Sequence, residues 1–393
     1  MTAPRPEVAE VIAQSAAAYE ARYGTSPGQR RLLRDLASCR TAALGGHKQQ
    51  CAQCGHEVLA YNSCRNRHCP KCQGPARAAW LAARAADLLP VPYFHVVFTL
   101  PAPLGPLAFQ NKRLLYGMLF RAAAATLRTI ARDPKHLGAD IGFLAVLHTW
   151  GQTLQHHPHL HCVVPGGGLA AEGTRWVACR PHFFLPVRVV SRRFRRTFLT
   201  LLRDARAQGK LQYHGPLAAL ADPTAWERWV HALAQIEWVV YAKPPFGGPE
   251  HVLKYLARYT HRVAIANQRL VSVADGQVTF RWKDYANNDR ARTMTLPAVE
   301  FLRRFLLHRL PHGFHHIRQY GLLGNRGRTS HLARCRELLG QPQAAADPPD
   351  PRDATAPRDV CPVCGTGRLT FVAILPAQPA LAPTARLLPW NSS

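Results

Sequence analysis

The stretch Gln155-His156-His157-Pro158-His159-Leu160-His161-Cys162-Val163-Val164 places several imidazoles directly before an apolar run. Side chains alternate between the two faces of an extended strand, so His157, His159 and His161 are expected on one face and Leu160 and Cys162 on the other. Two or three imidazoles on one strand face can hold a divalent metal ion. The alternative is a set of ordinary polar positions on a solvated face. Because only one leucine separates His159 from His161, we favour the metal site.

Apolar runs elsewhere in the chain predict the sheet that contains this strand. Residues 93–100, 143–150 and 236–242 are rich in β-branched and aromatic residues, which predicts further strands. The short connection around Gln155 predicts that 143–150 and 159–164 form an antiparallel pair. A hairpin is expected over 269–282, and helical spacing predicts helices at 8–36 with a break near Pro27, 76–88, 114–130 and 301–310. The expected class is α+β, an antiparallel sheet flanked by helices.

The charge balance of the chain indicates a polyanionic partner. Among 393 residues, 50 are Lys or Arg and 23 are Asp or Glu, a formal net charge of +27. Phosphate neutralisation by such cations supplies most non-specific affinity for nucleic acid, so DNA is the expected partner. A helix over 191–202 interleaves arginines with phenylalanines and is a candidate contact for single-stranded DNA, with a solvated helix face as the alternative.

The N-terminal residues lack the pattern of a signal peptide, and no window has the apolar length of a membrane helix. We therefore expect no membrane partner and a cytoplasmic, nucleoid-associated protein in a bacterium. In that reducing compartment cysteines are better explained as metal ligands than as disulfides. Six of the eleven cysteines fall between Cys39 and Cys72, which agrees with a metal-binding segment.

Two Cys-x-x-Cys turns in that segment predict a structural zinc site. Each turn presents two thiolates to one ion, so Cys51 and Cys54 are expected to pair with Cys69 and Cys72. A second zinc site, or ordinary core and surface positions, would account for the remaining candidates, Cys39, His47, Cys64 and His68. Between these ligands lie Arg65 and Arg67, which suit contact with a DNA backbone; a solvated rim is the alternative.

A third Cys-x-x-Cys turn, at Cys361 and Cys364, follows a stretch rich in Pro, Ala and Asp over 341–359 that we interpret as a linker. Candidate partners for this turn are His331 and Cys335. The expected organisation is a helical and zinc-binding module over 1–90, a catalytic domain over 91–330, and a linker with the last turn and a tail over 331–393.

A second group of candidate functional residues lies on a predicted helix that begins with Pro249 and continues over 250–260. Tyr255 and Tyr259 are four residues apart and therefore share one face of that helix. An aromatic stripe in a core would show the same spacing. The nearby cations favour a phosphate-binding surface instead; they are Lys254, Arg258, His261 and Arg262.

Strand histidines together with helix tyrosines suggest a reaction. A divalent ion held by His159 and His161 could polarise a phosphodiester, and a tyrosine oxygen could attack phosphorus to give a covalent 5′-phosphotyrosine and a free 3′-hydroxyl. A second tyrosine one turn away could accept a second strand. The first candidate for the third metal ligand is Gln152; the alternatives are His157, His148 and, less favourably, Asp140.

With these residues in view, the chain from Cys39 to about Arg328 resembles the rolling-circle transposases of the insertion sequence 91 family, within the HUH endonuclease superfamily. The resemblance rests on three stretches, 62–72, 157–161 and 255–262. It implies an HUH-type antiparallel-sheet core, a zinc-binding N-terminal module, single-stranded transposon ends as substrate, and catalytic Mg²⁺ or Mn²⁺. By this resemblance His159 and His161 match the metal pair, and Tyr255 and Tyr259 match the nucleophiles.

Three rival functions fit parts of the pattern. A plasmid replication initiator or relaxase of the same superfamily would use the same chemistry on another DNA. A zinc-ribbon DNA-binding protein without catalysis would have purely structural histidines. A zinc hydrolase would cleave its substrate with metal and without the tyrosines.

Overall fold

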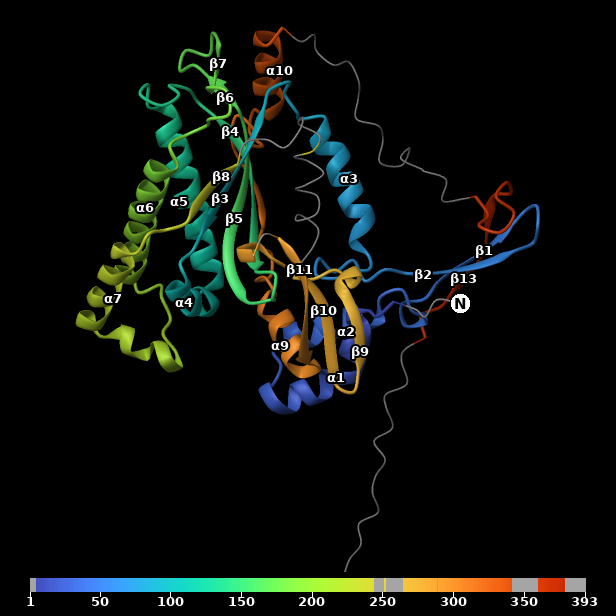
Figure 1. The fold of residues 1–393 in the computed structure, drawn as a ribbon. Coiled ribbons are helices and arrows are strands. Elements are labelled where there is room, and N and C mark those ends of the chain that lie inside the picture. Colours follow the sequence, from blue (N-terminus) through green and yellow to red (C-terminus); the bar gives the residue numbers. More distant parts are fainter. Residues whose placement is uncertain (1–4, 244–250, 252–263, 288, 341–359, 379–393) are drawn as a thin grey trace, which may run out of the picture.

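A five-stranded antiparallel sheet lies at the centre of the protein, in a computed structural model that describes residues 5–243, 251, 264–287, 289–340 and 360–378 (Figure 1). The strand order is β12-β4-β5-β3-β8. The strands are β3 (Tyr93–Thr99), β4 (Gly142–Trp150), β5 (His156–Pro165), β8 (Val240–Lys243) and β12 (Ile317–Gly321). The predicted antiparallel pairing of β4 with β5 is confirmed. The sequence did not predict β12, which is short and forms one edge of the sheet.

Strand β5 is the middle strand and is hydrogen-bonded on both sides. His159 lies opposite Thr99 of β3 and opposite His148 of β4. A bulge in the β4–β5 pairing follows His148 and shifts the register before Trp150. The register therefore brings a histidine of β4 beside the histidines of β5.

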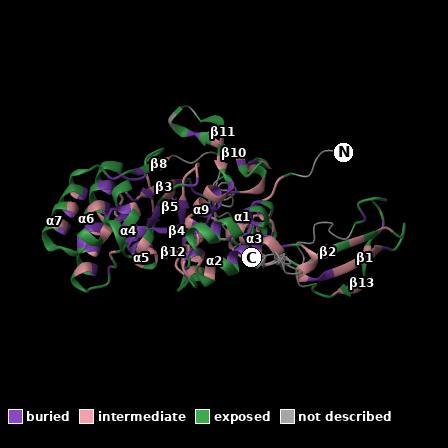
Figure 2. Ribbon diagram, turned by 90° about the horizontal axis from the view of Figure 1, so that it is seen from below, coloured by how far each residue is buried: buried purple, intermediate pink, exposed green. Residues whose placement is uncertain are grey.

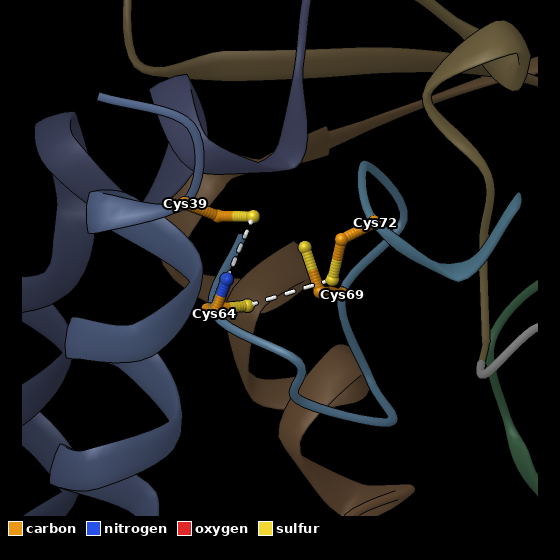
Figure 3. Close-up of side chains that lie close together, drawn as sticks. All are labelled: Cys39, Cys64, Cys69 and Cys72. Carbon is orange, nitrogen blue, oxygen red and sulfur yellow. Dashed lines mark hydrogen bonds between the residues drawn. The ribbon is translucent and has the colours of Figure 1, made fainter. Parts of the chain in front are cut away.

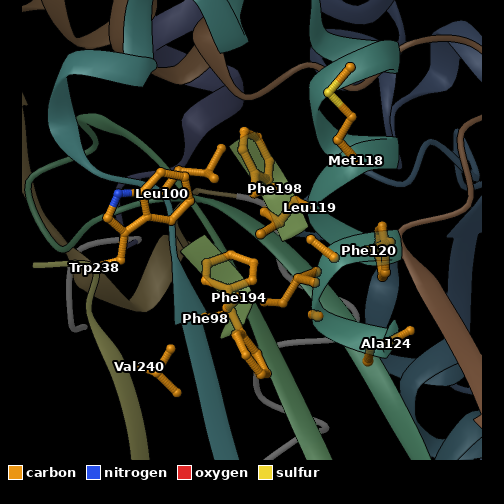
Figure 4. Close-up of a cluster of buried hydrophobic side chains, with 14 of the residues drawn as sticks. Phe98, Leu100, Met118, Leu119, Phe120, Ala124, Phe194, Phe198, Trp238 and Val240 are labelled. Carbon is orange, nitrogen blue, oxygen red and sulfur yellow. The ribbon is translucent and has the colours of Figure 1, made fainter. Parts of the chain in front are cut away.

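Helices cover one face of this sheet. The long helices α5 (Lys112–Arg132) and α6 (Val187–Ala207) pack against it, and Figure 4 shows the apolar core between them. Leu160 and Cys162 point into this core, as strand alternation predicted. Phe194 and Phe198 of α6 are also buried there, both against Trp238. The interleaved aromatics of α6 are therefore core residues, whereas Arg192, Arg193 and Arg196 of this helix are exposed, and its contact with single-stranded DNA remains a prediction.

A second unit joins the N-terminal helices to a later part of the chain. It comprises α1 (Val8–Tyr23), α2 (Pro27–Ser38), β9 (Leu270–Ala274), β10 (Gln277–Asp284), β11 (Arg290–Pro297) and α9 (Ala298–Leu307). Both N-terminal helices share one apolar cluster with β10 and α9, whose Phe280 and Phe301 rings meet edge to face. The predicted hairpin is present, with a turn at Asp275 and Gly276, both at positive φ. The domain boundaries at residues 90 and 330 remain predictions. The apolar cluster of the second unit contains residues from both sides of the first boundary.

A third, small sheet has the order β13-β1-β2 and stands apart from the body of the molecule (Figure 2). Its strands are β1 (Gly46–Cys51), β2 (Glu57–Tyr61) and β13 (Leu369–Leu375). The other described α-helices and strands are α3 (Gln73–Ala85), α4 (Gly105–Gln110), α7 (Pro223–Gln235), α10 (Arg328–Leu338), β6 (Gly167–Leu169) and β7 (Trp176–Ala178). The α+β class, with an antiparallel sheet flanked by helices and an N-terminal cysteine cluster, is confirmed. Among the described helices, none has the length and apolar character needed to span a bilayer.

His308 links the central sheet to the second unit. Its Nε2 donates to the carbonyl of Leu154 at 3.0 Å, so its Nδ1 accepts from the Thr149 hydroxyl at 3.2 Å. Burial lowers the pKa of His308 to about 3. The imidazole therefore stays neutral in the folded protein at pH values where it is protonated in the unfolded chain, whose histidine pKa is about 6.5.

This difference predicts a loss of stability in mild acid. Because the folded pKa lies below the unfolded one, the unfolded state binds the extra proton, and stability falls as the pH drops below about 6.5. His308 alone should cost about 2 kcal/mol of unfolding free energy between pH 7 and pH 5. Urea denaturation at both pH values measures this loss. The His308→Gln variant, which keeps an amide donor for Leu154 but does not titrate, should lose about 2 kcal/mol less than the wild type over the same range. An equal loss in both proteins would contradict the assignment.

Candidate active site

Three histidines from the two paired strands converge on the face of the sheet opposite the α5–α6 core. The ring nitrogens of His148, His159 and His161 that could bind a metal all lie within 4.8 Å of one another. The ring centroids of His148 and His161 are 4.2 Å apart, and those of His159 and His161 are 4.8 Å apart. This spacing is suited to one ion bound by three imidazoles.

Hydrogen bonds at the other ring nitrogen orient two of these ligands. His159 Nδ1 donates to the backbone carbonyl of His157 at 2.7 Å. His161 Nδ1 lies 2.7 Å from Nε2 of His95, which belongs to the neighbouring strand β3. Metal-bound histidines usually have their second nitrogen held in this way, which fixes the tautomer and the ring plane. In both residues Nε2 is then the atom that would bind the ion.

Burial keeps the imidazoles of His159 and His161 neutral. It lowers the pKa of His159 to about 4, and together with the neighbouring His148 it lowers the pKa of His161 well below its usual value. Neutral imidazole is the form that binds a metal. Three nitrogen donors are a softer set than Mg²⁺ prefers, so of the two ions that the resemblance implies, Mn²⁺ is the better match.

The structure favours His148 as the third ligand over the first candidate, Gln152. The Gln152 amide is already engaged by the second unit: its Nε2 donates to the Tyr285 hydroxyl at 3.0 Å, and its Oε1 accepts from the Lys283 amide at 3.4 Å. Asp140 is paired with Arg132 at 2.5 Å. We therefore propose His148, in place of Gln152, as the third metal ligand. The signal for His148 was present in the sequence as the one histidine of the predicted strand 143–150, but its alignment with His159 depends on the strand register.

The helix predicted to contain Tyr255 and Tyr259 falls on residues that the structure does not describe. The predicted DNA contacts Lys254, Arg258 and Arg262 lie outside the described residues as well. Strand β8 leads into that segment, and its last residue, Lys243, lies opposite His95 in the β3–β8 pairing. Lys243 therefore lies at the same level of the sheet as His95, twelve residues before Tyr255.

Four thiols converge at the junction between the N-terminal helices and α3. Cys39 follows α2, Cys64 follows β2, and Cys69 and Cys72 precede α3 (Figure 3). All four sulfur atoms lie within 4.8 Å of one another, and those of Cys64 and Cys72 are 3.8 Å apart. Four thiolates at about 2.3 Å around a tetrahedral zinc ion are separated by about 3.8 Å, so this cluster fits zinc.

This grouping corrects the pairing inferred from the sequence. The turn at Cys69 and Cys72 is completed by Cys39 and Cys64, whereas Cys51 and Cys54 lie with Cys361 and Cys364. Spacing along the chain identifies each turn but not its partner, which depends on how the chain folds back. His331 and Cys335, the candidates for the last turn, belong to α10 and are not in this group.

Neither predicted histidine belongs to a cysteine group. His47 lies on β1, with its ring 6.5 Å from that of Phe371. His68 is buried, its Nδ1 lies 3.0 Å from Asn66 Oδ1, and its Nε2 accepts from the Leu310 amide at 3.4 Å. Burial, with the charge of Arg67, lowers the pKa of His68 to about 3. These contacts give both residues structural roles as ring or hydrogen-bond partners.

The two predicted DNA contacts in this segment have different surroundings. Arg67 is half-buried and donates to the carbonyl of Phe314 at 2.7 Å, so its guanidinium stabilises the fold. Arg65 is exposed, at a positive φ of 52°. Of the two, Arg65 is the one placed to meet a DNA backbone, and its role remains a prediction.

Comparisons with known proteins agree with this arrangement. Residues 11–100 match the family described as "Transposase zinc-binding domain", and residues 142–330 match the family described as "Putative transposase". The chain is 56% identical over 94% of its length to "Putative transposase y4qJ" of Sinorhizobium fredii (strain NBRC 101917 / NGR234), covering 95% of that protein. It is 30% identical over 86% of its length to "Transposase for insertion sequence element IS801" of Pseudomonas savastanoi pv. phaseolicola, covering 82% of that protein. No solved structure is significantly similar to the chain.

These matches define the class of the protein as a transposase with a zinc-binding domain, an enzyme that acts on DNA. More particularly, the chain belongs to the insertion sequence 91 family of transposases. The second matched region contains His148, His159 and His161, and the first contains Cys39 and Cys72.

The histidine geometry predicts an order of effects on metal binding. His148→Ala and His159→Ala each remove a ligand and should reduce Mn²⁺ binding below detection, whereas His95→Ala removes only the partner of His161 and should weaken it about 10- to 100-fold. Isothermal titration of each full-length variant with Mn²⁺ measures these changes. The matched control is His157→Ala, which leaves the backbone carbonyl that holds His159 in place. Binding lost in the control and retained in His148→Ala would make His157 the third ligand.

Proposed function

We propose that this protein nicks and rejoins single-stranded DNA at the ends of a transposon by metal-assisted tyrosine attack, as a rolling-circle transposase. The observation that carries the proposal is the group of three histidines on the central sheet, which lie within reach of one ion and of which burial keeps His159 and His161 neutral. Membership of a transposase family makes DNA the substrate. Strand β8 ends at Lys243, which lies opposite His95 and twelve residues before Tyr255.

Each group has a distinct role in the proposed reaction. His148, His159 and His161 would hold a divalent ion, which when bound polarises the scissile phosphodiester. The Tyr255 or Tyr259 oxygen, after losing its proton, forms a bond to phosphorus, and the bond from phosphorus to the 3′ oxygen breaks. The products are a 5′-phosphotyrosine and a 3′ oxygen that takes up a proton. Attack by a free 3′-hydroxyl reverses the step, so rejoining needs no external energy source.

Cationic side chains would hold the DNA strand during this step. The net charge of +27 favours association with a polyanion. Exposed Arg65 lies beside the first cysteine cluster, and Lys254, Arg258 and Arg262 flank the tyrosines in the sequence. Transposition is favoured over plasmid replication or transfer because both named relatives are transposases.

A covalent adduct tests the tyrosine assignment. Wild-type protein incubated with single-stranded DNA from a transposon end and Mn²⁺ should yield a protein–DNA adduct that survives a denaturing gel. The Tyr255→Phe, Tyr259→Phe double variant should lose it by roughly 10³-fold or more, as expected for removal of a nucleophile. Tyr23→Phe is the matched control, because Tyr23 is exposed on α1 and belongs to the second unit.

The same experiment separates the rival functions. Binding of the DNA with no adduct and no cleavage would indicate a DNA-binding protein without catalysis. Metal-dependent cleavage that persists in the double variant would indicate a hydrolase, and an adduct that persists there would assign another nucleophile.

A further inference from the structure

The second group of four thiols joins two segments that are more than 300 residues apart in the chain. Cys51 is the last residue of β1 and Cys54 lies in the turn that follows, while Cys361 and Cys364 lie just before β13. Cys51 Sγ is 3.7 Å from Cys364 Sγ, and Cys54 Sγ is 3.6 Å from Cys361 Sγ. These separations are near the roughly 3.8 Å expected for thiolates around a tetrahedral zinc ion and far from the disulfide length of about 2.05 Å.

The two turns have the same construction. In each, the glycine after the second cysteine has a positive φ, +72° at Gly55 and +70° at Gly365, and its amide donates to the carbonyl of the first cysteine at 3.0 Å. In each, a backbone amide also donates to the first sulfur at 3.4 Å, from Gln53 to Cys51 and from Val363 to Cys361. Amide donors of this kind stabilise thiolates, the form that binds zinc.

Backbone contacts hold the turns face to face. The Ala52 amide donates to the carbonyl of Arg368 at 3.1 Å, and β1 and β13 pair antiparallel from Gly46 opposite Leu375 to Cys51 opposite Leu369. Gly367 passes so close to the sulfurs that a Cβ there would lie 2.4 Å from Cys51 Sγ. The close approach therefore requires glycine at this position.

The small sheet has little apolar packing of its own. Its large apolar side chains are exposed, 76% for Ile374, 62% for Phe371 and 53% for Leu59. A sheet of three short strands with so little buried apolar area is marginal in water without another source of stability. Metal binding supplies such stability in small domains that lack a core.

We propose that Cys51, Cys54, Cys361 and Cys364 bind a second structural zinc ion, which fastens the C-terminal strand β13 to the N-terminal hairpin. This site extends beyond the matched zinc-binding domain, which ends at residue 100, and beyond the transposase match, which ends at residue 330. It does not depend on the tyrosine chemistry, because it shares no residue with the histidine site.

Zinc content of the full-length protein tests the proposal. Mass spectrometry of the metal should find two zinc ions per wild-type chain and one in the Cys361→Ser, Cys364→Ser double variant. Cys51→Ser, Cys54→Ser should lose the same ion, and Cys179→Ser, which alters a cysteine of neither group, should keep both. Two ions retained in the Cys361→Ser, Cys364→Ser variant would overturn the proposal, because the second ion would then bind without Cys361 and Cys364.

Alkylation of wild-type protein provides a test that requires no variant to fold. Exposed Cys54 and partly exposed Cys364 should resist iodoacetamide while zinc is bound. During titration with a chelator, all four cysteines of the site should become reactive in one step, as followed by peptide mass spectrometry. Reaction of Cys361 and Cys364 while Cys51 and Cys54 stay protected would overturn the shared site.

Discussion

The hydrogen bonding of β5 on both sides is the constraint on which the proposed active site depends. With β3 on one edge and β4 on the other, a shift of one residue would turn His159 and His161 into the α5–α6 core and expose Leu160. The apolar packing of one face therefore fixes the imidazoles of the other. Burial on that strand also keeps the rings of His159 and His161 neutral, so the packing that stabilises the fold holds these imidazoles in the form that can bind a metal.

The cysteine groups serve parts of the chain that the central sheet does not organise. The first group lies within the apolar cluster of α1, α2 and α9, where Cys39 and Cys69 are buried. The second lies beside a sheet that buries little apolar surface. A metal that bridges distant segments limits the conformations of the unfolded chain and replaces packing that these segments lack. Two such ions would hold together segments that are distant in the chain, beside a central sheet that is stabilised mainly by its own packing.

Local patterns predicted the elements whose side-chain periodicity is strong. Alternation identified β5, and the Asp275-Gly276 turn identified the β9–β10 hairpin. The third ligand could not be assigned, because the position of His148 depends on the β4–β5 register and its bulge. The predicted pairing of Cys51 and Cys54 with Cys69 and Cys72 was wrong for a similar reason. Strand β13 is more than 300 residues away from β1, and the pairing of these two strands leaves no local signal in the sequence.

The most direct measurement is a crystal structure of the protein with Mn²⁺ and a single-stranded transposon end, with anomalous scattering used to locate the ion. We expect one manganese peak bound by His148, His159 and His161, with the oxygen of Tyr255 or Tyr259 facing the scissile phosphate beside that ion. An ion bound away from these histidines, or both tyrosines on the opposite face of the sheet, would contradict this expectation.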